Sequence, residues 1–170
     1  MPSKSKTKGS NGERELCKIL SEELGGSFIR VPTSGAMIGG QNNFRAKAMS
    51  DTQVKIFRGD IIPPDHLPKI VIECKSYKDF RFHQLLQPGS CPILDEWIRQ
   101  TVDIIKEEDK WFVMFKINLI GWYVAIPENS CDNYIFDNFG KYKSPFGNVV
   151  ITSLVNFLKS NKDEIIKKCS

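Results

Sequence analysis

Two acidic residues and a lysine, Asp60, Glu73 and Lys75, have the types and the order that a magnesium-dependent phosphodiesterase requires. Side chains at i and i+2 of a strand share a face, so Glu73 and Lys75 project together and Cys74 points to the opposite layer. A turn at 63–65 can bring Asp60 back beside Glu73. Two adjacent carboxylates repel unless a cation lies between them, and Mg²⁺ prefers such oxygen ligands. The spacing therefore predicts a Mg²⁺ site, with Lys75 beside it to orient water or to neutralise charge on a phosphate.

The apolar residues 70–72 directly precede Glu73 and predict a buried strand. An isolated Glu-x-Lys pair on a strand is usually a solvated ion pair without a chemical role. Here, however, the charges lie at the end of a buried strand, and the turn can bring Asp60 beside them. This combination favours the metal-site interpretation over the solvated ion pair.

A third carboxylate, Glu13, lies on an amphipathic helix predicted over residues 10–24. It precedes Leu16 and Leu20 by three and seven positions, at the edge of the apolar stripe that faces the core. A carboxylate there is a candidate ligand for a metal or a water. The alternative is a helix cap, because Ser10 and Glu13 have the spacing of a capping box, and the spacing taken alone favours the cap.

Several short blocks follow one another along the chain: residues 8–16, 28–35, 59–61, 72–75 and 115–122. Their order resembles the archaeal-type Holliday junction resolvases, a branch of the PD-(D/E)XK nuclease superfamily. The likeness spans roughly residues 8–126 and is specific for the superfamily, less so for the junction-resolving branch. It implies an α/β fold, a restriction-endonuclease-like sandwich with a mixed central β-sheet flanked by helices.

The resemblance also implies roles for individual residues. Glu13, Asp60, Glu73 and Lys75 would form the catalytic set, with Lys75 positioning or activating the attacking water. Asp60 and Glu73 would bind Mg²⁺ directly, the backbone carbonyl of Cys74 would be a further ligand, and Glu13 would act through water. Mn²⁺ is expected to substitute for Mg²⁺, because both accept octahedral oxygen sites.

Contacts to DNA are predicted from the resemblance and from the distribution of positive charge. Arg14 and Arg30 match arginines that engage the phosphate backbone, and Ser34 matches a serine near the scissile phosphate. A glycine- and amide-rich insertion and a basic N-terminal arm add further cations, which attract phosphate without reading sequence. An ordinary surface charge is an equally compatible role for Arg14, and a surface loop for the insertion. The predicted DNA-binding residues are Lys8, Arg14, Arg30, Ser34, Arg45, Lys47 and Arg58.

A chain of 170 residues without a long linker fits one domain. We expect a basic flexible arm over 1–9, a nuclease core over 10–126 with an inserted loop at about 36–58, and a C-terminal helical extension over 127–170 packed on the same domain. The further elements predicted from periodicity are a helix over 93–108, strands over 111–117 and 120–126, and helices over 149–158 and 163–168.

Other features exclude several classes of protein. The five cysteines lack paired spacing, which argues against a zinc site or a disulfide framework. Only two histidines occur, and no P-loop or dinucleotide fingerprint is present, so no nucleotide cofactor is expected. No apolar run approaches the ~18 residues of a membrane span. A cytoplasmic location is therefore expected, in the host cytoplasm if the chain is phage-encoded.

The sequence predicts a Mg²⁺-dependent, structure-selective endodeoxyribonuclease that acts on branched DNA and resolves four-way junctions by paired phosphodiester hydrolysis. A homodimer would match the two-fold symmetry of such a junction. One alternative is a restriction-like or repair endonuclease for linear or flapped DNA. The other is a non-catalytic DNA-binding protein of the same fold.

Overall fold

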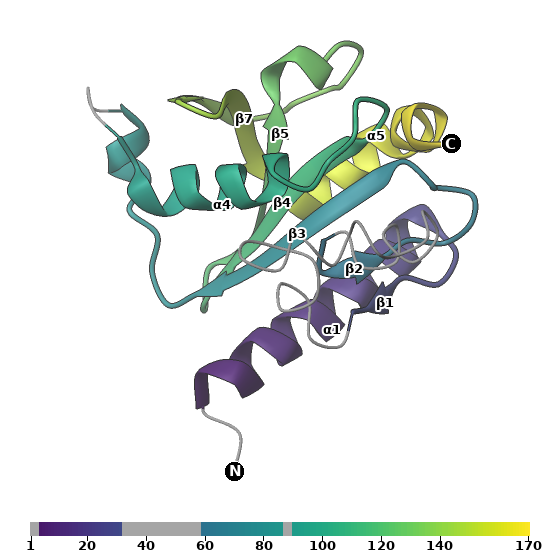
Figure 1. The fold of residues 1–170 in the computed structure, drawn as a ribbon, viewed down its shortest axis with the longest axis horizontal. Coiled ribbons are helices and arrows are strands. Elements are labelled where there is room, and N and C mark those ends of the chain that lie inside the picture. Colours follow the sequence, from purple (N-terminus) through teal and green to yellow (C-terminus); the bar gives the residue numbers. More distant parts are fainter. Residues whose placement is uncertain (1–3, 32–58, 87–89) are drawn as a thin grey trace.

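The computed structural model describes residues 4–31, 59–86 and 90–170, and its elements are labelled in Figure 1. The predicted residues Ser34, Arg45, Lys47 and Arg58 lie outside the described residues. In chain order the elements are α1 (Lys4–Leu24), β1 (Ile29–Arg30), β2 (Ile61–Ile62), β3 (Ile70–Tyr77), η2 (Phe82–Leu86), α4 (Pro92–Val102), β4 (Lys110–Ile117), β5 (Gly121–Pro127), η3 (Glu128–Ser130), β6 (Phe139–Ser144), β7 (Gly147–Ser153) and α5 (Leu154–Cys169).

A five-stranded mixed sheet in the order β3-β4-β5-β7-β6 forms the centre of the protein. β3 and β4 are parallel, and the chain between them passes through η2 and α4. All other neighbours in this sheet are antiparallel, and β1 and β2 form a separate antiparallel pair. Among the described strands, β3 has a sheet neighbour on one side only, so one row of its backbone amides and carbonyls is available to other groups.

Helices cover both faces of the sheet, as the alternation of side chains along β3 requires. Ile70, Ile72 and Cys74 belong to the apolar cluster that includes residues of α1 and α5. Val71 belongs to the cluster on the opposite face, beneath α4. Figure 1 shows β3 between α4 and α1. The predicted α/β sandwich of restriction-endonuclease type is therefore confirmed.

The first helix is longer than the sequence pattern indicates. α1 begins at Lys4, so residues 4–9, predicted as a basic flexible arm, lie in a helix in this structure. Ser10 lies inside the helix, which removes the capping-box interpretation of Glu13. The apolar stripe begins only after Ser10, but lysine supports helix well and no proline interrupts residues 4–9, so polar residues extend the helix beyond the stripe.

The C-terminal segment differs most from the prediction. Residues 149–153, predicted as helix, belong to β7, which pairs with β5 through partners such as Ala125 and Ile151. Val149, Val150 and Ile151 are β-branched and favour a strand once a partner strand is present. The rest of the helix predicted over 149–158 and the helix predicted over 163–168 form one helix, α5, with a kink at Asn161. Residues 127–170 therefore complete the sheet with β6 and β7 and are not purely a helical extension.

The remaining elements follow the prediction closely. The strands predicted over 111–117 and 120–126 correspond to β4 and β5 within one residue at each end. The helix predicted over 93–108 ends early, at Val102. Its buried face carries Leu94, Trp97 and Ile98, as the periodicity indicates.

Candidate active site

Asp60 is held at the open edge of β3 by backbone hydrogen bonds. Its own amide donates to the carbonyl of Ile72 at 2.9 Å, and its carboxylate accepts the amide of Cys74 at 2.8 Å. Its carbonyl accepts the amide of Val31 at 2.9 Å. Asp60 as a whole is only 8% exposed. Three hydrogen bonds to backbone groups therefore fix the position of Asp60 independently of any ligand.

Gly59 makes this close approach possible. Its φ is +76°, which is rarely adopted by residues with a side chain. A Cβ atom at this position would lie 2.6 Å from the carbonyl oxygen of Ile72. Both features require glycine, so Gly59 is part of the site although it carries no functional group. Gly59 belongs to the block 59–61 that was singled out in the sequence, but the sequence alone did not indicate that this glycine positions Asp60.

Glu73 and Lys75 share one face of β3, as predicted, whereas Cys74 lies in the core on the other face. Lys75 Nζ donates to Glu73 Oε1 at 2.5 Å, and Glu73 is 8% exposed. The amide and carbonyl of one strand residue point to the same edge of the strand. Because the Cys74 amide binds Asp60, the Cys74 carbonyl also faces that edge.

The carboxylates influence one another strongly. Burial raises the pKa of Glu73 to about 7, and the negative charge of Asp60 adds to this shift while Lys75 opposes it. Burial alone lowers the pKa of Lys75, but the charge and hydrogen bond of Glu73 outweigh it, so the pKa of Lys75 is raised. The pKa of the buried Cys74 thiol is raised by burial and then by the charges of Asp60, Glu13 and Glu73. Three carboxylates therefore surround this part of β3.

Glu13 reaches the site from the interior of α1. Arg30 Nε donates a hydrogen bond to Glu13 Oε2, so the arginine predicted to contact phosphate is paired with a predicted site carboxylate in this structure. The side chains of Arg30 and Glu13 are 29% and 14% exposed. Gly12 is buried, and a Cβ there would lie 3.3 Å from the Cβ of Ser76. The close packing of α1 on β3 thereby sets the position of Glu13.

The donor set fits a divalent cation. Two mutually repelling, buried carboxylates and a backbone carbonyl offer the oxygen atoms that hard cations prefer, and a cation would relieve the repulsion. Within the described ranges, no group of three or more His, Cys, Asp or Glu side chains is arranged to hold a metal ion. Asp60, Glu73 and the Cys74 carbonyl are the groups at this edge that could hold such a cation.

The structure adds a residue that the sequence pattern did not indicate. Gln100 of α4 accepts a hydrogen bond from Lys75 Nζ through its Oε1 at 2.9 Å. Its amide nitrogen donates to Glu96 at 2.7 Å. The periodicity of α4 predicted its buried face, and the polar face carries no motif that would single out Gln100.

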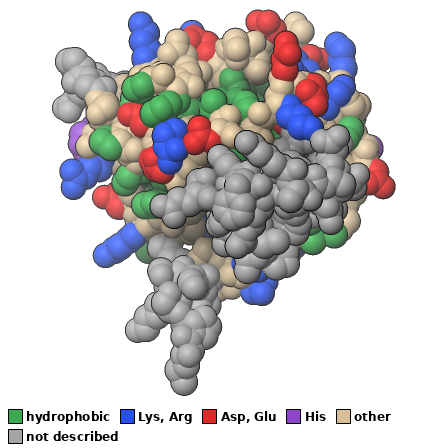
Figure 2. Space-filling view, in the orientation of Figure 1, with side chains coloured by type: hydrophobic (Ala, Val, Ile, Leu, Met, Phe, Trp, Pro, Cys, Tyr) green, Lys and Arg blue, Asp and Glu red, His purple; other side chains and the backbone are tan. Residues whose placement is uncertain are grey.

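Among the described residues, the other residues predicted to contact DNA do not lie together at the site. Arg14 is exposed, with its Nη1 3.5 Å from the side-chain oxygen of Asn11. Lys8 lies in α1, but its side chain is outside the described residues. On the face drawn in Figure 2, lysine and arginine side chains are interspersed with acidic ones and form no single cationic patch among the described residues.

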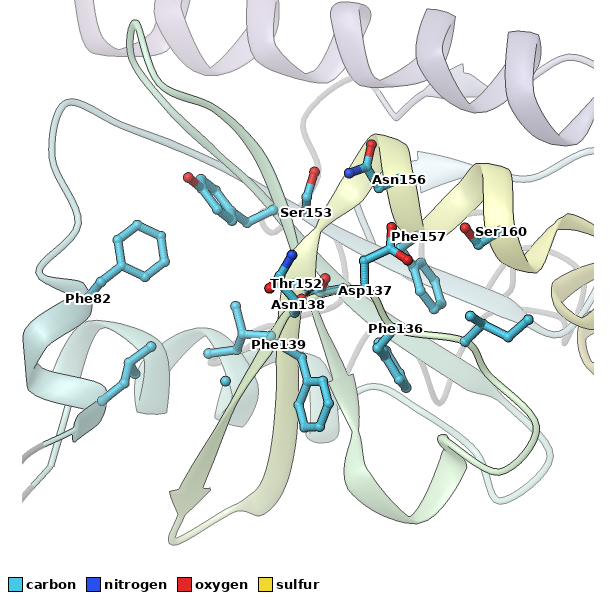
Figure 3. Close-up of a pocket in the computed structure, with 15 residues that line it drawn as sticks. Phe82, Phe136, Asp137, Asn138, Phe139, Thr152, Ser153, Asn156, Phe157 and Ser160 are labelled. Atoms are coloured by element: carbon cyan, nitrogen blue, oxygen red, sulfur yellow. Dashed lines mark hydrogen bonds between the residues drawn. The ribbon is translucent and has the colours of Figure 1, made fainter.

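A cavity of about 350 Å³ lies elsewhere, between η2, the sheet and α5. Figure 3 shows Phe82 on one side of it and Phe136 and Phe157 on the other. None of the residues that line it belongs to the predicted catalytic set. The predicted catalytic residues therefore lie at the outer edge of β3 and not in this cavity.

Two further expectations concern the chain as a whole. All five cysteines are free in this structure. In the part of the chain that the structure describes, no helix combines the length and the apolar character needed to span a membrane.

The sandwich fold, with two carboxylates and a lysine around its edge strand, is the arrangement of a PD-(D/E)XK nuclease core. A family model described as phage putative PDDEXK endonuclease matches residues 4–167. The chain belongs to this family, and the superfamily predicted from the sequence is confirmed. Nucleases of this superfamily generally use divalent metal ions. Comparisons with curated proteins and with solved structures found no match.

Replacing Gly59 by alanine tests how Asp60 is positioned. The variant is expected to lose about 2–4 kcal/mol of unfolding free energy, because it combines an unfavourable φ with a clash against Ile72. Gly25→Ala is the matched control: Gly25 also has a positive φ, +81°, but no atom lies within 4 Å of its Cβ position. Denaturant unfolding should show a clearly larger loss for Gly59→Ala, and equal losses would contradict this role for Gly59.

The raised pKa of Glu73 predicts a pH dependence of stability in the metal-free protein. Between its ordinary pKa of 4.5 and about 7, the folded protein binds more protons at Glu73 than the unfolded chain does. The free energy of unfolding should therefore fall as pH rises through this range, by up to about 3 kcal/mol, and then level off.

Denaturant unfolding of Glu73→Gln, which has no ionisable group at this position, should show a much smaller fall between pH 4.5 and 7. Glu128→Gln is the control, because hydrogen bonding by Lys141 lowers the pKa of Glu128 and any stability it contributes is lost only at lower pH. An unchanged slope in Glu73→Gln would show that another group causes the dependence.

Proposed function

We propose that this protein is a Mg²⁺-dependent, structure-selective endodeoxyribonuclease that resolves four-way DNA junctions by paired phosphodiester hydrolysis. The observation that supports it best is the pairing of Asp60 and Glu73, each 8% exposed, beside the ammonium group of Lys75. A binding module has little reason to keep two buried carboxylates facing a phosphate backbone, because they repel both each other and the phosphates.

Asp60, Glu73 and the Cys74 carbonyl would hold the cation, and Glu13 would bind one of its waters. When bound, Mg²⁺ supplies positive charge that stabilises the developing charge on the phosphate and favours attack by water. Mn²⁺ would substitute for it.

Lys75 has a defined part in this chemistry. Because its pKa is raised, its ammonium group stays charged and can only donate hydrogen bonds. We therefore assign it to orienting the attacking water and to neutralising charge on the phosphate, and not to accepting a proton. Arg30 holds the Glu13 carboxylate, and its guanidinium would become available to a phosphate if DNA drew it away from that pair.

The choice of branched DNA rests on the resemblance to junction resolvases described above. A four-way junction has approximate two-fold symmetry and requires nicks in two opposing strands, so a homodimer would present two sites to it. The protein would then act on DNA in the cytoplasm of the host cell.

The test is cleavage of a labelled immobile four-way junction, compared with linear duplex, single strand and flap of the same sequence, in Mg²⁺ and in EDTA. We expect paired symmetric nicks confined to the junction and dependent on Mg²⁺. Preferential cutting of linear or flapped DNA would replace the proposal by a restriction-like or repair nuclease. Binding without cutting would favour a non-catalytic DNA-binding protein.

Glu73→Ala separates cleavage from binding in the same assay. Loss of a direct ligand should lower the cleavage rate by about 10³-fold or more, while junction binding is retained. Glu128→Ala, at a carboxylate paired with Lys141 outside the site, should cleave as the unmodified protein does. Retained cleavage in Glu73→Ala would refute the assignment of the site.

A further inference from the structure

The Lys75 ammonium group is held from two directions by different elements. Glu73 Oε1, on the same strand, lies 2.5 Å from Nζ, and Gln100 Oε1, on α4, lies 2.9 Å from it. The Lys75 side chain is only 20% exposed. A long flexible side chain is thereby confined to one position, and α4 as well as β3 determines where its charge lies.

The orientation of the Gln100 amide is determined by its other neighbour. Its Nε2 donates to Glu96 Oε1 at 2.7 Å, and a carboxylate at this position can only accept. Glu96 is in turn bound through both oxygens by Arg99, from Nε at 2.9 Å and from Nη2 at 2.8 Å. With its nitrogen facing Glu96, Gln100 must present its oxygen to Lys75.

These contacts form a continuous chain of hydrogen bonds along one side of α4, which we call the Gln100-Glu96-Arg99 relay. Residues three and four positions apart in a helix are neighbours, which brings Glu96, Arg99 and Gln100 together, and Arg99 also reaches Asp103 at 2.7 Å. Hydrogen bonds from Arg99 and then Gln100 lower the pKa of Glu96 to about 2, so the acceptor for the Gln100 amide stays ionised.

The helix that carries the relay is fixed to the far edge of the sheet. Asp95 accepts hydrogen bonds from the Tyr142 hydroxyl at 2.8 Å and the Ser144 hydroxyl at 2.7 Å, both on β6. The Tyr142 oxygen accepts the amide of Cys91 at 2.7 Å, next to the start of α4. Trp97 is buried beneath the helix. Gln100 is therefore presented from a rigid support.

We propose that Gln100 is a positioning residue for Lys75, and that the Gln100-Glu96-Arg99 relay holds the ammonium group where the reaction needs it; this rests on the proposed nuclease function. A cation bound by Asp60 and Glu73 would draw the Glu73 carboxylate toward itself and weaken its pairing with Lys75. Gln100 would then be the partner that still holds the ammonium group. A neutral amide oxygen does so without cancelling the positive charge that the phosphate requires.

The direct test is Gln100→Met, which keeps an unbranched side chain and removes the acceptor. With DNA and Mg²⁺ saturating, the single-turnover cleavage rate should fall about 10- to 100-fold, because a displaced reacting group costs rate and not binding. The affinities for DNA and for Ca²⁺ should stay within about twofold, and thermal unfolding should confirm a folded protein. Gln84→Met, at a glutamine on η2, is the control and should cleave at the unmodified rate.

A double-mutant cycle distinguishes positioning through Lys75 from any independent effect. If Gln100 acts only through Lys75, the double variant Gln100→Met, Lys75→Met should cleave no more slowly than Lys75→Met alone. Multiplying effects of the two substitutions would show that Gln100 acts by another route and would overturn the proposal, as would an unchanged rate in Gln100→Met.

A second measurement does not depend on cleavage. In the Ca²⁺-loaded protein, the ¹H–¹⁵N NMR signal of the Lys75 ammonium should be protected from exchange with water, and Gln100→Met should abolish this protection. Protection that persists in the variant would refute the tether itself. Absence of DNA cleavage by the unmodified protein would instead refute the nuclease function, so the two failures are distinguishable.

Discussion

The hydrogen bond from the Cys74 amide to the Asp60 carboxylate is the constraint on which the site depends. It brings a second buried carboxylate beside Glu73, and the resulting repulsion contributes to the raised pKa of Glu73. The bond exists because no strand in the described part of the chain pairs with the outer amides of β3, and because Gly59 lets the chain come close enough. Binding a cation is the simplest way to compensate for two carboxylates in such a place.

The rest of the fold keeps this arrangement in position. α1 packs closely on β3 and supplies Glu13, while α4 on the opposite face supplies Gln100 to Lys75. β6 lies at the opposite end of the sheet from β3, and its Tyr142 and Ser144 bind Asp95 and hold α4. The C-terminal segment thus supports the chemistry indirectly, by completing the sheet and anchoring the helix above it.

Features that depend on the local residue pattern and on the order of the elements could be predicted from the sequence. The shared face of Glu73 and Lys75 follows from strand periodicity, and the α/β sandwich follows from the order of elements. Three features depended on contacts between distant segments and could not be predicted in this way. Residues 149–153 become a strand only because β5 offers a partner, Arg30 pairs with Glu13 across the fold, and Gln100 reaches Lys75 only once α4 packs on the sheet.

Asp60 and Glu73 are proposed to hold a divalent cation between them. The most direct measurement is anomalous X-ray diffraction from crystals of the protein soaked in Mn²⁺. We expect a peak within bonding distance of both carboxylates, with the Cys74 carbonyl as a third protein ligand. Full occupancy at other residues, or no peak at this edge of β3 at saturating Mn²⁺, would contradict it.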